Sequence, residues 1–214
     1  MDLRDIKEFF RDFMGYIITF AIIIFIFTFV IAFHPIAGNS MTPNLEEGNI
    51  VAVNKFYHNL FDMKRNQIVI VKKESKTYIK RIVGLPGERI SFKNNVLYVN
   101  EQGYKENFLG NVTTDDFTFE DICNKMDCPD SVIPPDYYLV LGDNRNDSMD
   151  SRNKKFGLVH KDEIQGLVIA RIWPVNNIGK VWKKSYFFSL KNNAILWTFR
   201  YNCIIINTKS KFVC

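Results

Sequence analysis

The feature that most constrains this chain is a long uncharged apolar run over residues 15–33, which is rich in Ile and Phe. At a rise of ~1.5 Å per residue, a helix of this length spans roughly 28 Å, close to the ~30 Å hydrocarbon core of a bilayer. A signal peptide usually has a shorter apolar region ending in a small-x-small site, but this run ends in Ala32-Phe33-His34-Pro35. We therefore predict an uncleaved transmembrane anchor rather than a signal peptide or a buried core helix.

The basic residues around this run indicate its orientation. Arg4, Lys7 and Arg11 precede it, and the first basic residue after it is Lys55. Because Lys and Arg near a span favour the cytoplasmic side, we expect segment 1–14 to lie inside, along the membrane interface, and everything after the single span to lie outside.

The net charge argues against a nucleic-acid-binding protein. The chain carries +5 overall, yet residues 164–214 contain eight Lys or Arg and no acidic residue, so the rest has 20 basic against 23 acidic residues, or −3. The basicity belongs to a basic, aromatic tail over 180–214 and is not spread over a fold. We expect this tail to be attracted to anionic lipid, but its pattern specifies no structure.

After the anchor the helical periodicity disappears. Short β-branched or aromatic segments, bounded by Gly, Pro, Asn or Asp, predict strands at 50–53, 67–71, 77–83, 89–92, 96–99, 137–141 and 167–173. We predict a mainly β domain over 34–179, antiparallel and Greek-key or barrel-like. The polar stretch 101–135 is expected to be a long excursion from this domain.

The cysteines fit an external location. Cys123 and Cys128 are close enough to form a small disulfide loop in an oxidising compartment. Cys203 and Cys214 have no evident partner. The three histidines are widely scattered, so we expect no metal site.

A serine follows the apolar run by seven residues, in Gly38-Asn39-Ser40-Met41-Thr42-Pro43. Alone, such a serine is most simply a turn former or a helix cap. As a nucleophile it would need a neighbouring base.

Lys80 is the candidate base. In the strand 77–83, alternation puts Tyr78, Lys80 and Ile82 on one face and Arg81 on the other, so one cation shares a face with apolar neighbours. A lysine on an edge strand could extend its amine to water. A buried lysine would instead have a lowered pKa and could act as a base near neutral pH.

A polar loop over 142–152 follows the predicted strand 137–141. Its simplest interpretation is a turn-rich connection. Asp150 and Arg152 could form a supporting ion pair, and Ser148 could hydrogen-bond to a catalytic amine.

Together these stretches resemble the ordered motifs of bacterial type I signal peptidases. The resemblance runs from the anchor to about residue 179 and rests on Ser40-Met41-x-Pro43, Lys80-Arg81-x-Val83-Gly84-x-Pro86-Gly87 and Gly142-Asp143-Asn144-Arg145-x-x-Ser148-x-Asp150-Ser151-Arg152. It implies a serine endopeptidase that removes signal peptides from exported preproteins, with Ser40 as nucleophile and Lys80 as general base. Ser148 would orient the amine, Asp150 and Arg152 would hold the loop, and no metal or organic cofactor is implied.

The resemblance also implies substrate contacts. Ile36, Met41 and Ile79 would line shallow pockets for small side chains. The family's oxyanion hole uses the backbone N–H of the nucleophile, and some members add a serine hydroxyl two residues earlier. Here that position is Gly38, so the hydroxyl is missing.

The expected partners are preproteins bearing signal peptides, the lipid bilayer and the secretion translocase. The expected location is the plasma membrane of a bacterium, or the membrane of an organelle of bacterial descent. Three alternatives stay open: a membrane-tethered binding protein without catalysis on the same scaffold, a self-cleaving Ser/Lys protease, and a Ser–His enzyme using His34.

Overall fold

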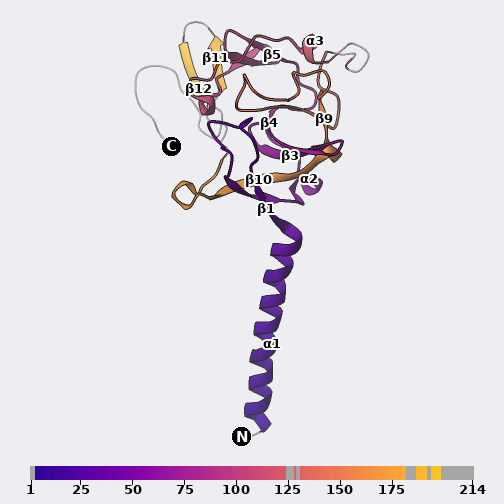
Figure 1. Ribbon diagram of the computed structural model, residues 1–214, viewed down its shortest axis with the longest axis vertical. Coiled ribbons are helices and arrows are strands. Elements are labelled where there is room, and N and C mark those ends of the chain that lie inside the picture. Colours follow the sequence, from indigo (N-terminus) through magenta and orange to yellow (C-terminus); the bar gives the residue numbers. More distant parts are fainter. Residues whose placement is uncertain (1–2, 124–127, 129–130, 182–186, 192–193, 199–214) are drawn as a thin grey trace.

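A computed structural model describes residues 3–123, 128, 131–181, 187–191 and 194–198. The chain forms a β-rich body from which one long helix projects (Figure 1). The remaining tail residues of 180–214, with Cys203 and Cys214, lie outside the described residues.

Helix α1 covers Leu3–Phe25, and a π-helical turn, η1, extends it over Ile26–Val30. Within these elements Phe13–Val30 is long and apolar enough to cross a membrane, and none of this stretch is buried by the rest of the protein. Strand β1, Ile31–Pro35, follows directly. The last three residues of the predicted span 15–33 therefore belong to a strand of the folded domain.

A seven-stranded antiparallel sheet forms the main body. Its order is β1-β2-β10-β3-β4-β8-β9. Beyond β1 the strands are β2 Ile50–Asn54, β3 Ile68–Lys73, β4 Lys76–Gly84, β8 Tyr137–Leu141, β9 Val159–His160 and β10 Ile164–Trp173.

A five-stranded antiparallel sheet, of order β12-β11-β7-β6-β5, completes the domain. Its strands are β5 Ile90–Lys93, β6 Val96–Val99, β7 Gln102–Tyr104, β11 Phe187–Lys191 and β12 Ala194–Thr198. Asn94 and Asn95 both have positive φ and form the two-residue turn between β5 and β6, a conformation that Asn tolerates and that matches the twist of a hairpin. The predicted mainly antiparallel β fold behind one apolar helix is confirmed, and all seven predicted strands are present.

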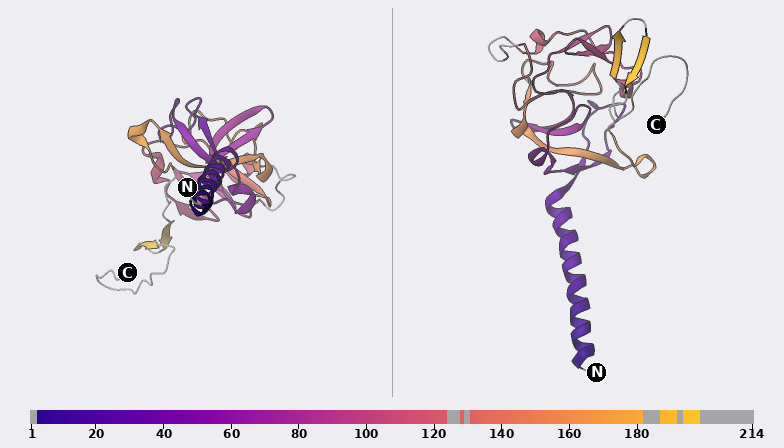
Figure 2. Two further views of the ribbon diagram at one scale, coloured as in Figure 1. Left: turned by 90° about the horizontal axis from the view of Figure 1, so that it is seen from below. Right: turned by 180° about the vertical axis from the view of Figure 1, so that it is seen from behind.

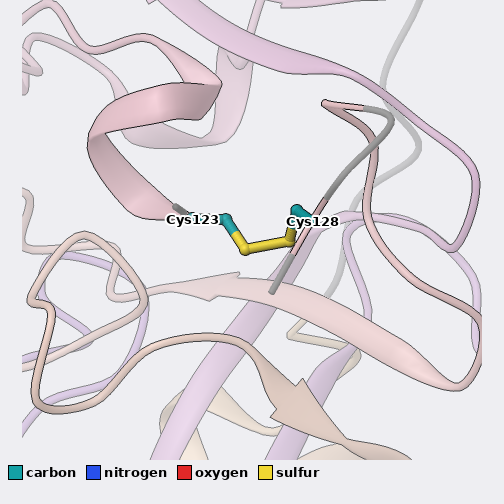
Figure 3. The surroundings of a disulfide bond; sticks show 2 residues. All are labelled: Cys123 and Cys128. Carbon is teal, nitrogen blue, oxygen red and sulfur yellow. A yellow bond between two sulfur atoms is a disulfide. The ribbon is translucent and has the colours of Figure 1, made fainter. Parts of the chain in front are cut away.

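Short helices fill the connections: α2 Tyr57–Leu60, η2 Asn107–Leu109, α3 Phe119–Ile122, η3 Lys161–Glu163 and η4 Val175–Asn177. The excursion 101–135 thus contains β7, η2 and α3. After α3, a disulfide joins Cys123 to Cys128 across 6.0 Å between their Cα atoms (Figure 3). Both cysteines belong to the buried cluster that also includes Ile133, Leu139 and Leu141.

The sheet is covered on both faces where β3 and β4 lie. On one face Val69, Val71 and Ile82 join a buried cluster, and on the other face Ile68 and Ile70 join a second one. The part of β4 from Lys80 to Gly84 therefore runs through the interior of the domain, where both faces of the strand meet apolar side chains.

The disulfide predicts a thiol-labelling pattern. Protein isolated from membranes and unfolded without reductant should leave Cys123 and Cys128 unlabelled, because their sulfurs are bonded to each other. Reduction should expose both, and Cys123→Ser should expose Cys128 alone. Mass spectrometry of the labelled peptides measures this, and labelling of both cysteines before reduction would contradict the disulfide.

Candidate active site

The candidate site begins with Lys80, in the middle of β4. Tyr78 and Ile82 pack on one apolar cluster, whereas Ile79 packs on another, as strand alternation requires. We expected one of the two adjacent cations to share a face with apolar neighbours; instead both are buried, Lys80 with 2% and Arg81 with 0% of their surface exposed. Lys80 is therefore not an edge-strand lysine that extends its amine to water.

Ser40 lies against the amine of Lys80. The Lys80 Nζ donates a 2.7 Å hydrogen bond to Ser40 Oγ. The serine sits in the turn after β1, and its carbonyl oxygen accepts a 3.0 Å bond from the Asn144 N–H. Asn144 also donates its side-chain amide to the Asn39 carbonyl at 3.2 Å. Hydrogen bonds from the loop 142–152 therefore fix the backbone of the serine turn, while Lys80 on β4 fixes the Ser40 hydroxyl.

The surroundings of Lys80 favour its neutral form. Burial lowers the pKa of the Lys80 amine from 10.5 to about 8, although the charges of Asp150 and Asp143 act in the opposite direction. A lysine with this pKa has a substantial neutral fraction near pH 8 and can accept a proton from a hydroxyl that touches it.

Arg81, the neighbour of Lys80, fixes β4 to the loop 142–152. Its guanidinium makes two hydrogen bonds to the Asp143 carboxylate, at 2.7 and 2.6 Å, and both side chains are fully buried. A third bond, of 2.8 Å, reaches the Asn66 carbonyl. Asn44, on the serine-bearing segment, donates to Asp143 at 2.9 Å. Asp143 therefore joins the segments that carry Ser40 and Lys80.

Gly142 lies against the turn that carries Ser40. A Cβ at this position would lie 2.1 Å from Ser148 Oγ and 2.5 Å from the Ser40 carbonyl oxygen, both closer than atoms can approach. Its N–H donates to Asp150 at 3.0 Å, and its carbonyl accepts from Arg145 at 3.0 Å. Only a glycine fits this contact, which keeps Ser148 beside the serine turn.

Asp150 and Arg152 form a bidentate ion pair, with bonds of 2.9 and 2.8 Å. Burial acts to raise the pKa of Asp150, but the hydrogen bonds and charge of Arg152 outweigh it, so the pKa lies below its usual value. Ser148 Oγ is buried and, in the described part of the chain, has no partner in hydrogen-bond geometry, although the Ser148 hydroxyl also acts to lower the pKa of Asp150. The described hydrogen bonds therefore do not join it to Lys80.

Arg145 ties the loop to the excursion. It makes a bidentate pair with Glu106, at 2.8 and 2.7 Å, and a 3.1 Å bond to Thr114 Oγ1. The side chains of Arg145 and Glu106 are 0% and 5% exposed. No sequence pattern identifies Glu106 as a partner of Arg145, because it lies 39 residues earlier in a polar stretch.

The three residues predicted to line substrate pockets occupy one cluster. Ile36 and Met41 are core members with 4% and 1% exposure, and the partly buried Ile79 packs against them. Gly38 has a φ of +79°, with nothing within 4 Å of where its Cβ would be. Among the described residues no group of three His, Cys, Asp or Glu could hold a metal ion.

The chain is similar to known proteins. The family described as signal peptidase, peptidase S26, matches residues 9–173. Signal peptidase I of Bacillus caldolyticus is 39% identical over 155 residues, covering 68% of this chain and 81% of that protein. Signal peptidase IB of Staphylococcus aureus is 34% identical over 177 residues, covering 78% and 91%. A crystal structure of a signal peptidase I from Enterococcus faecalis V583 is 31% identical and covers 50% of this chain and 97% of that one, with a TM-score of 0.45.

The buried ion pair between Arg145 and Glu106 predicts that its loss lowers the free energy of unfolding more than the loss of an exposed ion pair does. Glu106→Gln should lower the free energy of unfolding by about 3 kcal/mol, because it leaves a buried guanidinium without its counter-charge. Glu120→Gln is the matched control, since it breaks the exposed pair with Arg89 and should cost less than about 1 kcal/mol. Denaturant unfolding in detergent measures both, and equal losses would contradict the assigned importance of burial.

Proposed function

Because this chain belongs to the signal peptidase family, peptidase S26, and removes signal peptides as a serine endopeptidase, we propose that Ser40 and Lys80 are its catalytic pair. The observation that carries this proposal is the 2.7 Å hydrogen bond from a buried lysine amine to the serine hydroxyl. A binding protein without catalysis has no need to bury a lysine against a serine. The Ser–His alternative is disfavoured because the hydroxyl already has its base.

The reaction proceeds in two halves. Neutral Lys80 accepts the Ser40 proton as the oxygen attacks the scissile carbonyl carbon. The amine then returns this proton to the departing nitrogen, which leaves an acyl-enzyme on Ser40. Lys80 next accepts a proton from water, whose oxygen attacks the carbonyl carbon of the ester. The Lys80 ammonium then returns this proton to Ser40 Oγ as its bond to the acyl carbon breaks, which releases the signal peptide and restores the enzyme. The loop 142–152 positions the catalytic pair. Its Asp143 binds Arg81, the neighbour of Lys80, and its Gly142 lies against the turn of Ser40.

The negative charge that develops on the carbonyl oxygen needs donors. We assign the backbone N–H of Ser40 to this role. Gly38 supplies no hydroxyl, and its φ of +79° favours glycine over a residue with a side chain. One hydrogen-bond donor can be worth roughly 3 kcal/mol of transition-state stabilisation. Backbone N–H groups must therefore supply a larger share of the oxyanion stabilisation here than in relatives that have a serine at the position of Gly38.

We place the substrate along the open edge of β4. Its residues Lys76–Gly84 pair with β3, but β8 pairs only with the part from Arg81 onward. No described strand pairs with the first half of β4 on the side away from β3. Strand alternation puts the N–H and C=O of Ile79 on that edge, so an extended peptide could add there as a strand. Ile36, Met41 and Ile79 would then contact its small side chains.

We infer that the protein is a single-pass protein of a bacterial plasma membrane, or of the membrane of an organelle of bacterial descent, with its N-terminus inside. The candidate span, the basic residues before it and the disulfide support this orientation. We further infer that 1–14 is the interfacial segment and that the peptidase domain begins at β1, at Ile31, and includes the strands β11 and β12 of the basic segment 180–214. The bilayer holds the anchor, and the translocase delivers preproteins to the same outer surface.

Ser40→Ala and Lys80→Ala should each lower the cleavage rate of a preprotein by roughly 10⁴-fold or more, because neither half of the pair acts alone. Lys80→His should also be nearly inactive, since an imidazole does not reach the serine from this strand. Ser75→Ala, in the turn before β4, and Lys93→Ala, in β5, are the matched controls at exposed positions and should keep full activity. Turnover by folded Ser40→Ala would rule out the assigned nucleophile.

The lowered pKa of Lys80 also sets the pH dependence. Protonated Lys80 cannot accept the serine proton, so kcat/KM should fall about tenfold per pH unit below pH 8 and level off above it. Rates on a peptide substrate in detergent, from pH 6 to 10, measure this profile. A profile that is flat across pH 8, or that falls as pH rises, would exclude Lys80 as the base.

A further inference from the structure

The serine turn, residues 38–45 between β1 and β2, is bound at two points by the loop that follows β8. Near the start of the turn, the Asn144 N–H donates to the Ser40 carbonyl at 3.0 Å. Near its end, the Asn44 side chain donates to the Asp143 carboxylate at 2.9 Å. Because Asp143 and Asn144 are adjacent in the chain, one short piece of the loop holds both ends of the turn.

The Asn44 amide makes two hydrogen bonds that lead out of the turn. One reaches Asp143 Oδ2 and the other reaches the Phe108 carbonyl in η2, each at 2.9 Å. The Asp143 carboxylate also pairs with Arg81, whose guanidinium lies over the Phe108 ring, with its Cζ 4.2 Å from the ring centroid. Asn44 therefore binds both groups that enclose Arg81, the neighbour of Lys80.

The turn also has bonds of its own. The Leu45 N–H donates to the Met41 carbonyl at 2.9 Å, and both side chains are buried in one apolar cluster. The Thr42 N–H and hydroxyl both donate to the Asn39 carbonyl. These bonds stay within the turn and keep it folded, whereas the bonds of the Asn44 side chain join it to its surroundings. Asn44 therefore affects where the turn lies more than whether it forms.

We propose that Asn44 is a positioning residue for the reaction, whose two hydrogen bonds fix the distance between the Ser40 hydroxyl and the Lys80 amine. This inference rests on the catalytic pair proposed above. No described hydrogen bond joins Asn44 to that hydroxyl or that amine, so it acts through the turn on one side and through Asp143 and Arg81 on the other. Proton transfer needs the two atoms within hydrogen-bond reach, 2.7 Å here. A displacement of about 1 Å can lower the rate roughly 100-fold.

This link lies within the β body of the protein. Its members come from the turn before β2, from β4, from η2 and from the loop after β8, whereas α1 projects away from the body (Figure 1 and the right-hand view of Figure 2). Cleavage of a soluble peptide by the full-length protein in detergent therefore measures the effect of the link without a contribution from the bilayer.

Two substitutions separate hydrogen bonding from packing. Asn44→Ala removes both donors and most of the side-chain volume, whereas Asn44→Leu keeps a similar shape without a donor. We expect both to lower kcat about 30-fold and to change KM less than about threefold, because the serine is displaced while the substrate edge of β4 is not.

Asn49→Ala is the matched control. This asparagine is also buried and follows the same turn, and its side chain accepts from Arg171 at 3.3 Å, but it makes no described hydrogen bond to Asp143. Its kcat should stay within about threefold of the unsubstituted protein. A loss in Asn49→Ala equal to that in Asn44→Ala would contradict a specific role for Asn44.

A pH profile distinguishes displacement of the serine from a change at the lysine. Lys80 stays buried when Asn44 is replaced, so kcat/KM should keep its midpoint near pH 8 while its plateau falls. A midpoint that moves toward the ordinary lysine value would show that Asn44 acts on the burial of Lys80, and would overturn the proposal. Full kcat in Asn44→Leu would also overturn it, because shape alone would then suffice.

Circular dichroism and gel filtration of each variant check its folding, and Asn44→Leu carries the test if Asn44→Ala does not fold. Failure of both to fold would overturn the proposal, because Asn44 would then be needed to form the turn. Ser40→Ala in the same assay separates this proposal from that of the catalytic pair. If Ser40→Ala is inactive and Asn44→Leu fully active, only the role of Asn44 falls; if Ser40→Ala cleaves the peptide, the pair falls and the role of Asn44 with it.

Discussion

The hydrogen bond between Lys80 Nζ and Ser40 Oγ is the interaction on which the rest of the structure depends. A serine hydroxyl is a weak nucleophile until a base takes its proton, and a lysine is a base only where its ammonium is disfavoured. Both conditions come from one location: the middle of a strand that is covered on both faces. The fold supplies this strand, and the serine is brought to it from a turn 40 residues away in the sequence.

Burying the amine has a cost that the surrounding ion pairs help to offset. Lowering the pKa from 10.5 to about 8 corresponds to about 3 kcal/mol of folding free energy below pH 8. The unfolded state binds more protons than the folded state between about pH 8 and 10.5, so this cost disappears as pH rises through that window. Close to Lys80, Arg81 is paired with Asp143 and Arg152 is paired with Asp150, so each of these charges has a partner of opposite sign. They hold the loop rigid without leaving a carboxylate free to pair directly with Lys80.

Much of this arrangement could be predicted from local pattern, because β-branched runs between turn residues identify strands and ordered motifs identify the family. Strand β1 was missed because its apolar residues continue the run of the anchor without a break. The buried Arg81–Asp143 pair was missed because alternation was used to place only one of the two adjacent cations among apolar neighbours. The contact of Arg145 with Glu106 depends on how the excursion folds back, which no local pattern specifies.

The most direct test of this account is the titration of the Lys80 amine itself. Lysines labelled with ¹³C next to Nζ can be followed by NMR across pH in full-length protein, with Lys80→Met to assign the signal. We predict that one lysine titrates near pH 8 and that Ser40→Ala leaves it far below the ordinary lysine value, because burial is the main cause of the shift. A Lys80 signal that titrates at or above the ordinary lysine value would contradict the claim that the fold makes this lysine a base.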